Sequence, residues 1–270
     1  MLRISPYSRL TGLSLILMTA SHWAGADVLG LTGGKTVWVA ELTGESQSTA
    51  SRAAKQKPVD FNKLALTSEY YSGLWLELEH PLPFVPNIRM SYTNIESAKR
   101  VRDTTVVPGG DGIEVSNPQN IDTALAFNNL DATLYYQILD NWVNIDLGLT
   151  ARKLDGYLDV FYELSEQFPR NFPHSNTELH QIVPMLYGKT QFDIPGTSIY
   201  LQAMANGVTY NGDTFVDAEA KVGASLDVLP GLNLGVALGY RTMKLKMINT
   251  GNLYADAQID GFQAEFTAHF

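Results

Sequence analysis

The sequence predicts an all-β fold: a transmembrane antiparallel up-and-down β-barrel of about ten strands, with eight or twelve strands as alternatives. Three observations predict it. The chain begins with features of an export signal, apolar and polar residues alternate along many later segments, and short connections alternate with long ones. Successive side chains of a strand point to opposite faces, so a strand between lipid and a lumen shows this alternation.

Residues 1–26 have the three parts of a secretory signal peptide. Arg3 and Arg9 give a basic start, an apolar run follows at 13–18, and small residues end the segment. The apolar run is shorter than the roughly 20 residues that a membrane-spanning helix needs. We therefore expect a signal peptide over 1–26 and an outer-membrane barrel over 27–270.

The composition excludes several classes of protein. The full chain has 19 basic and 28 acidic residues, a net charge of −9, and its lysines and arginines are scattered rather than clustered. An acidic chain without a basic patch argues against a nucleic-acid partner. The chain has no cysteine, so it forms no disulfide and carries no lipid on an N-terminal cysteine. No motif calls for a cofactor, and we expect none.

Alternation persists for nine or more residues in several segments, about the length of a tilted strand that crosses a membrane. The clearest run is 216–228, where valine, alanine and leucine fill the even positions. The last nine residues, 262–270, alternate in the same way and end on an aromatic residue. Ten strands are expected to begin near Thr36, Ser72, Asn87, Ala124, Trp142, Glu178, Ser198, Thr214, Leu232 and Ala255.

The connections between these strands alternate in length. Short turns are expected at 80–87, 139–141, 194–197 and 229–231, and longer polar connections at 44–69, 97–122 and 155–177. Outer-membrane barrels have tight periplasmic turns and long extracellular loops. An even number of strands then returns both termini to the periplasm.

Two long stretches carry a resemblance to known proteins. They are LELEHPLPFVPNIR at 76–89 and LYYQILDNWVNIDLGLTAR at 134–152, with shorter similar stretches at 183–189 and 253–256 and the terminal Phe270. They resemble an uncharacterised family of small Gram-negative outer-membrane β-barrel proteins. The resemblance implies the fold and a location in the outer membrane. It implies no activity and no functional residue.

If the apolar face of each strand is turned to lipid, the opposite face is turned to the lumen. It brings charged residues of both signs into the lumen. Unpaired charges out of water are costly, so we expect these groups to pair across the interior. A barrel of about eight strands is already filled by side chains, which favours a plugged lumen over the alternative of a narrow water-filled path. The predicted lumen charges are Glu77, Glu79, Arg89, Asp131, Asp146, Arg152, Lys189, Asp217, Glu219, Lys221, Arg241 and Glu265.

The C-terminal strand is also a candidate assembly signal. Phe262, Phe266 and Phe270 lie on its apolar face. The resemblance to outer-membrane barrels implies that the barrel-assembly machinery recognises this end. Outer-membrane lipid and lipopolysaccharide are the other expected partners.

A lipid-modifying enzyme, a hydrolase or acyltransferase, is the rival function from another class. Nucleophilic catalysis needs a serine, a histidine and an acid that converge. His174 and His180 fall on the long-loop side, near Ser175 and Glu178. Histidines in a polar loop are mostly solvated, so we expect no enzyme and no catalytic residue.

Metal binding has weaker support. Asp103, Asp111 and Glu114 lie in one long connection but lack the spacing of a dedicated calcium loop. We therefore expect no metal site.

The sequence thus favours a structural or small-solute channel protein. A third alternative is a soluble periplasmic barrel that binds a lipophilic ligand, which would need an apolar interior and a polar exterior.

Overall fold

The computed structural model describes residues 29–48, 59–61, 69–82, 84–103, 107–108, 114–115, 119–163, 174–248 and 253–270. The predicted signal peptide over 1–26 lies outside the described residues. Among the described residues, no helix is long and apolar enough to span a membrane.

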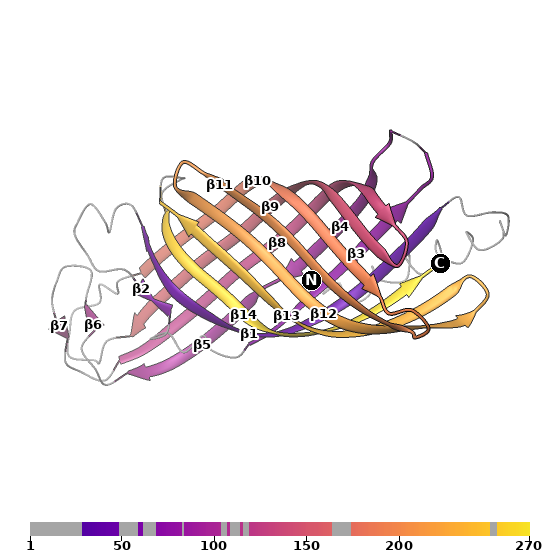
Figure 1. Cartoon of the computed structure of the whole chain (residues 1–270). Helices are drawn as coiled ribbons and strands as arrows, with labels where there is room; N and C mark the ends of the chain where they lie inside the picture. The colour runs from indigo at the N-terminus through magenta and orange to yellow at the C-terminus, as the bar shows by residue number, and fades with distance from the viewer. Residues whose placement is uncertain are drawn as a thin grey trace, which may run out of the picture.

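Ten antiparallel strands form a closed barrel, and the predicted fold class and strand number are confirmed (Figure 1). Each strand pairs with its neighbours in sequence order, and the last strand pairs with the first from Thr32–His269 to Ser48–Leu253, which closes the wall. The ten strands are β1 (Gly30–Ser48), β3 (Glu69–Glu79), β4 (Asn87–Asn94), β8 (Gln119–Asp140), β9 (Val143–Glu163), β10 (His174–Asp193), β11 (Ile199–Tyr210), β12 (Asp213–Leu229), β13 (Leu232–Met247) and β14 (Leu253–His269).

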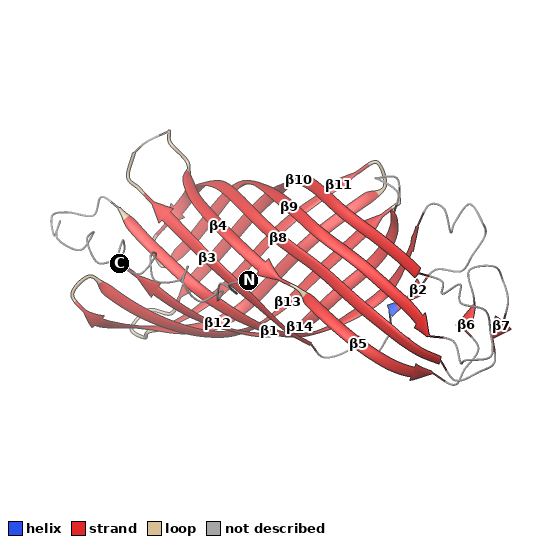
Figure 2. Cartoon of the chain, turned by 180° about the vertical axis from the view of Figure 1, so that it is seen from behind, coloured by secondary structure: helices blue, strands red, loops and turns tan. Residues whose placement is uncertain are grey.

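Four short strands lie at the long-loop side, and two of them, β5 and β2, add to this wall. β5 (Glu96–Asp103) continues the course of β4 beyond Ile95 and pairs with β8 (Figure 2). β2 (Val59–Asp60) pairs with the upper part of β1. β6 (Val107–Pro108) and β7 (Glu114–Val115) form a separate two-stranded sheet.

The short turns lie together at one rim, the right-hand end of the barrel in Figure 1. β1 begins and β14 ends at this rim, where the backbones of Leu31 and Phe270 exchange two hydrogen bonds of 3.1 and 2.8 Å. At the other rim, Asn211 and Gly212 join β11 to β12 with φ angles of 53° and 90°. Positive φ at both positions suits the type I′ turn that a two-residue hairpin needs.

Below the long-loop rim, the outward face of the wall is an apolar band. Leu74 on β3, Leu238 on β13 and Phe262 on β14 are 59%, 66% and 74% exposed. Aromatic side chains pair on this band, as in the edge-to-face contact of Tyr240 with Phe262 at 5.3 Å. An exposed apolar surface of this extent is stable against lipid rather than water.

Toward the long-loop rim, the outward face changes from apolar to polar within single strands. On β13, Thr242 and Lys244 follow Tyr240, and on β14 the outward residue beyond Phe262 is Asp260. Thr242 and Asp260 are register partners, so the change occurs at one level of the wall. The apolar band therefore ends there.

The inward face changes in the opposite sense at the same level. On β13, buried Met243 follows buried Arg241, and on β9 buried Leu154 follows buried Arg152. Ile259 is the matching inward residue on β14. The barrel thus has a polar interior where the apolar band surrounds it. Between this band and the long-loop rim, it has an apolar interior inside a polar surface.

This reversal predicts unequal costs in stability for the same substitution at two outward positions of β13. Leu238→Arg should lower the free energy of unfolding by about 2–4 kcal/mol, because the guanidinium would face hydrocarbon near the middle of the band. Thr242→Arg should change it by less than about 1 kcal/mol, because that position is above the band and beside Asp260. Urea unfolding in lipid vesicles measures both. Equal costs would mean that the edge of the band is misplaced.

Candidate functional site: the barrel interior

The structure places all twelve predicted lumen charges on the inward face of the wall, nine of them buried. The alternation of burial along each strand sets this orientation. On β3, for example, Glu77 is 5% exposed, whereas its neighbours Leu76 and Leu78 are 47% and 37% exposed. The interior contains five bases and seven acids from this set, and they gather in three clusters.

The central cluster joins four strands. Arg152 on β9 donates to both carboxylate oxygens of Asp131 on β8, at 2.7 and 2.6 Å, and to Asp217 on β12, at 2.7 Å. Arg241 on β13 binds Asp217 through two further hydrogen bonds of 2.8 Å. Bidentate guanidinium–carboxylate pairs are among the strongest and most directional polar contacts. Since β9 and β12 are not neighbours in the wall, Arg152 ties opposite parts of it together.

The second cluster lies toward the short-turn rim. Glu77 on β3 accepts hydrogen bonds from Arg89 on β4 and from Lys189 on β10, the latter at 3.2 and 3.3 Å. Lys189 is also 3.0 Å from Asp146 on β9. Glu79, the last predicted charge on this side, accepts a 3.0 Å hydrogen bond from the Tyr135 hydroxyl.

The third cluster involves the C-terminal strand. Lys221 on β12 is 2.6 Å from Glu265 on β14 and 3.2 Å from Glu219. The Trp75 indole donates a 2.9 Å hydrogen bond to Glu265, and its ring lies 4.2 Å from the Arg89 guanidinium. Trp75 therefore connects the second and third clusters, a role that the alternation pattern alone did not indicate.

The three clusters nearly fill the space between them. The cavity that Arg89, Arg152, Arg241 and their acidic partners line has a volume of about 30 Å³. This cavity has room for only a few water molecules. In the described interior, the clusters thus form a polar plug rather than a lining.

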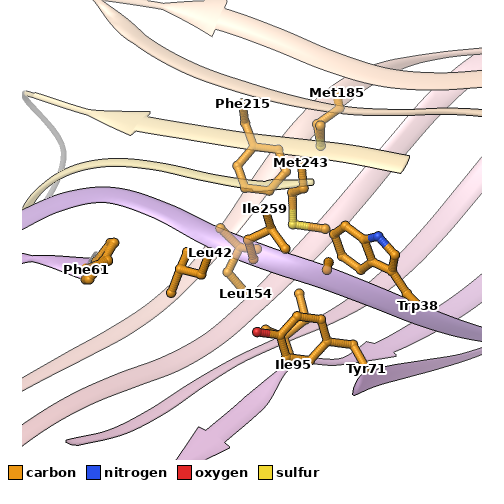
Figure 3. Packing of buried hydrophobic residues seen from close by; sticks show 11 residues of the cluster. Trp38, Leu42, Phe61, Tyr71, Ile95, Leu154, Met185, Phe215, Met243 and Ile259 are labelled. Atoms are coloured by element: carbon orange, nitrogen blue, oxygen red, sulfur yellow. The ribbon is translucent and has the colours of Figure 1, made fainter. Parts of the chain in front are cut away.

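The long-loop half of the interior is an apolar cluster that the sequence analysis missed (Figure 3). Its members come from every side of the barrel and are all less than 6% exposed. Part of the signal was available, because Leu154, Met185, Met243 and Ile259 occupy inward positions beyond the last inward charge of their strands. The cluster consists of Trp38, Ala40, Leu42, Phe61, Tyr71, Ile95, Leu154, Met185, Phe215, Met243 and Ile259.

Several polar atoms within this apolar region have no hydrogen-bond partner among the described residues. They include the indole nitrogen of Trp38, the hydroxyl of Tyr71 and the side-chain oxygen of Asn129. The three side chains are 1%, 2% and 1% exposed. Buried polar atoms are nearly always paired in native proteins, so these three need an explanation.

The residues considered for lipid chemistry do not converge in the described part of the structure. His180 points outward, and its Nδ1 is 2.9 Å from Asp155, which also lies 2.6 Å from Lys153. The hydrogen bonds from Lys153 and His180 hold the pKa of the Asp155 carboxyl below its ordinary value. The backbones of His174, Ser175 and Glu178 lie in β10, but their side chains are outside the description.

The acids considered for metal binding are mostly outside the described residues too. Asp111 is not described, and Asp103 and Glu114 are described only as backbone in β5 and β7. No group of three or more metal-ligating side chains occurs in the ranges that the structure describes.

The predicted assembly residues lie on the lipid side of the last strand. Phe262 and Phe266 are 74% and 52% exposed within the apolar band. Phe270 is 46% exposed at the short-turn rim, where its backbone takes part in closing the barrel.

The central cluster predicts a large cost for removing Arg152. Arg152→Gln should lower the free energy of unfolding by about 3–5 kcal/mol, because it leaves the buried Asp131 carboxylate without a cationic partner. Asp217 would keep Arg241. Urea unfolding of the refolded barrel in vesicles measures the cost.

The matched control for this substitution is the double variant Asp131→Asn with Arg152→Gln. It removes both charges, so most of the lost stability should return, and a double-mutant cycle gives the coupling between the two groups. If the double variant were as unstable as Arg152→Gln alone, the pairing would not explain the cost.

Comparisons with known proteins identify no family. No family model and no curated protein matches the chain. Similar solved structures include the outer membrane protease OmpT from Escherichia coli, at 11% identity and a TM-score of 0.44 over 89% of this chain and 95% of that one. Others are the Pseudomonas putida toluene transporter TodX (7%, 0.30, over 91% and 90%) and a Pseudomonas aeruginosa FadL homologue (10%, 0.29, over 90% and 89%). At these values, the similarities assign neither an activity nor a ligand to this chain.

Proposed function

We propose that this protein is an outer-membrane β-barrel with a lumen sealed against ions and hydrophilic solutes, acting as a structural protein or a channel of very low conductance. The observation that carries the proposal is the polar plug, in which paired charges from opposite sides of the wall leave a cavity of about 30 Å³. Open porins use 16 or more strands, and this wall has ten.

The surface of the barrel supports the location. A continuous apolar band surrounds a closed wall in which every strand has two neighbours, as a spanning β-structure requires. The short turns and both ends of the wall share one rim, which in outer-membrane barrels is the periplasmic rim. Lipid is then the partner of the band, and lipopolysaccharide that of its upper edge.

The sealed lumen is tested by single-channel recording of the refolded, full-length mature barrel in planar bilayers. We expect no openings, or small ones far below those of 16-stranded porins, because the plug leaves no continuous path for water. A 16-stranded porin reconstituted in the same bilayers is the control. Large, stable openings that pass sugars would refute the plugged lumen and establish a pore.

The proposed recognition of the last strand is tested at Phe270. Phe270→Ala keeps the two backbone hydrogen bonds to Leu31 but removes the ring. If the barrel-assembly machinery binds this aromatic group, the variant should be degraded or remain periplasmic, and cell fractionation with immunoblotting would show this. Phe270→Tyr retains a ring and should assemble normally. Wild-type outer-membrane levels of Phe270→Ala would contradict the proposed recognition.

A further inference from the structure

We propose that the apolar half of the interior binds a small, uncharged lipophilic molecule with one hydrogen-bonding oxygen, which enters sideways from the lipid between β10 and β11. This proposal rests on the membrane location proposed above. The ligand need not cross the polar plug, because the plug lies between the apolar cluster and the short-turn rim.

The first observation is a break in the wall. The ladder between β10 and β11 ends at the pair Leu186–Gly207, although β10 continues to His174 and β11 continues to Tyr210. Pro184, which cannot donate a backbone hydrogen bond, lies on β10 just beyond this pair. Proline in a sheet is confined to edges and bulges, so its presence here fits an edge that stays open.

The second observation is that apolar side chains lie on both the outward and the inward side of the wall at this break. Ile182 and Leu186 point outward and are 69% and 70% exposed. Between them, Met185 belongs to the buried apolar cluster, and Val183 and Val208 pack against it. Apolar side chains therefore extend from the lipid face to the interior around one strand edge.

The third observation is the set of unpartnered polar atoms inside the cluster. The Trp38 indole nitrogen can only donate a hydrogen bond, whereas the Tyr71 hydroxyl can donate or accept one. The two rings are neighbours, with centroids 5.7 Å apart. An oxygen on the ligand would satisfy the buried indole donor.

The charges around the cluster indicate that the ligand is neutral. The Arg241 guanidinium lies 5.0 Å from the Trp38 ring, and it already donates hydrogen bonds to both oxygens of Asp217. A carboxylate ligand would therefore find no unpaired cation among these groups. Met185 and Met243 line the cluster, and methionine adapts its shape to an incoming molecule more readily than branched side chains do.

The binding site is tested with a brominated alkylphenol, because bromine quenches tryptophan fluorescence at short range. The full-length mature barrel in phosphatidylcholine vesicles should show saturable quenching, above the linear background caused by partitioning into lipid. Trp38→Phe should remove the saturable part, whereas Trp142→Phe, at the exposed short-turn rim, should keep it. Purely linear quenching of the wild-type protein would overturn the site.

The route of access is tested with disulfides, which is practical because the chain has no cysteine. If the register of Leu186–Gly207 continued, Pro184 would oppose Thr209, and both positions are outward. Oxidised P184C/T209C should slow the saturable quenching at least tenfold, and reduction should restore the wild-type rate.

The matched control is G188C/A205C, which cross-links an outward pair within the existing ladder. The two designs differ by four residues along each strand, so both belong to the same class of cross-strand pair. The control should bind the phenol at the wild-type rate in both redox states. Wild-type rates in oxidised P184C/T209C would refute access through the break.

These results are separable from the test of the sealed lumen. A barrel that is silent in planar bilayers but shows no saturable quenching would keep its sealed lumen and lose the ligand site. A barrel that conducts sugars, and still binds the phenol only when the break is open, would lose the sealed lumen and keep the site.

Discussion

The ion pairs of Arg152 are the constraint on which the rest of the interior depends. A guanidinium that is 1% exposed must have acidic partners, and this one reaches Asp131 beside it and Asp217 on a strand that is not its neighbour. These contacts require the opposite walls to approach within the length of two side chains. The same closeness leaves a cavity of about 30 Å³. Stability and closure of the lumen therefore have one cause, since any widening would separate the buried Arg152 from Asp217.

The membrane adds a second constraint, which acts within single strands. Up to the level of Tyr240, the outward residues of β13 are apolar and face lipid, while its inward residues are small or polar and lead to the ion-paired Arg241. Beyond that level, water surrounds the wall, so the outward residues become polar and the interior takes the apolar side chains. A single strand thus contributes to a barrel with a polar interior within the membrane and, toward the long-loop rim, to a water-exposed barrel with an apolar core. The two alternatives that the sequence left apart, a charged lumen and an apolar interior, occur together at different heights.

The fold and the charged half of the interior followed from the sequence because alternation has a period of two and needs no knowledge of partners. Glu77 and Leu76 could be assigned to opposite faces from their positions alone. The pairing of Arg152 with Asp217, or of Trp75 with Glu265, depends on registers and on contacts across the barrel between residues far apart in sequence. The apolar cluster was missed for another reason. The sequence analysis treated each strand as having one lipid-facing side over its whole length. It therefore missed the level beyond which apolar side chains such as Leu154 and Met243 occupy the inward face.

The position of the break follows from the same two constraints. Unpaired backbone groups are costly in hydrocarbon, so an open strand edge is tolerated only where water or a protein interior is near. Pro184 is the register partner of Ala151, one outward position below Lys153, where the apolar band ends on β9. At Pro184, the unpaired edge lies between the upper edge of the band and the apolar cluster, so that water and a protein interior are both near it.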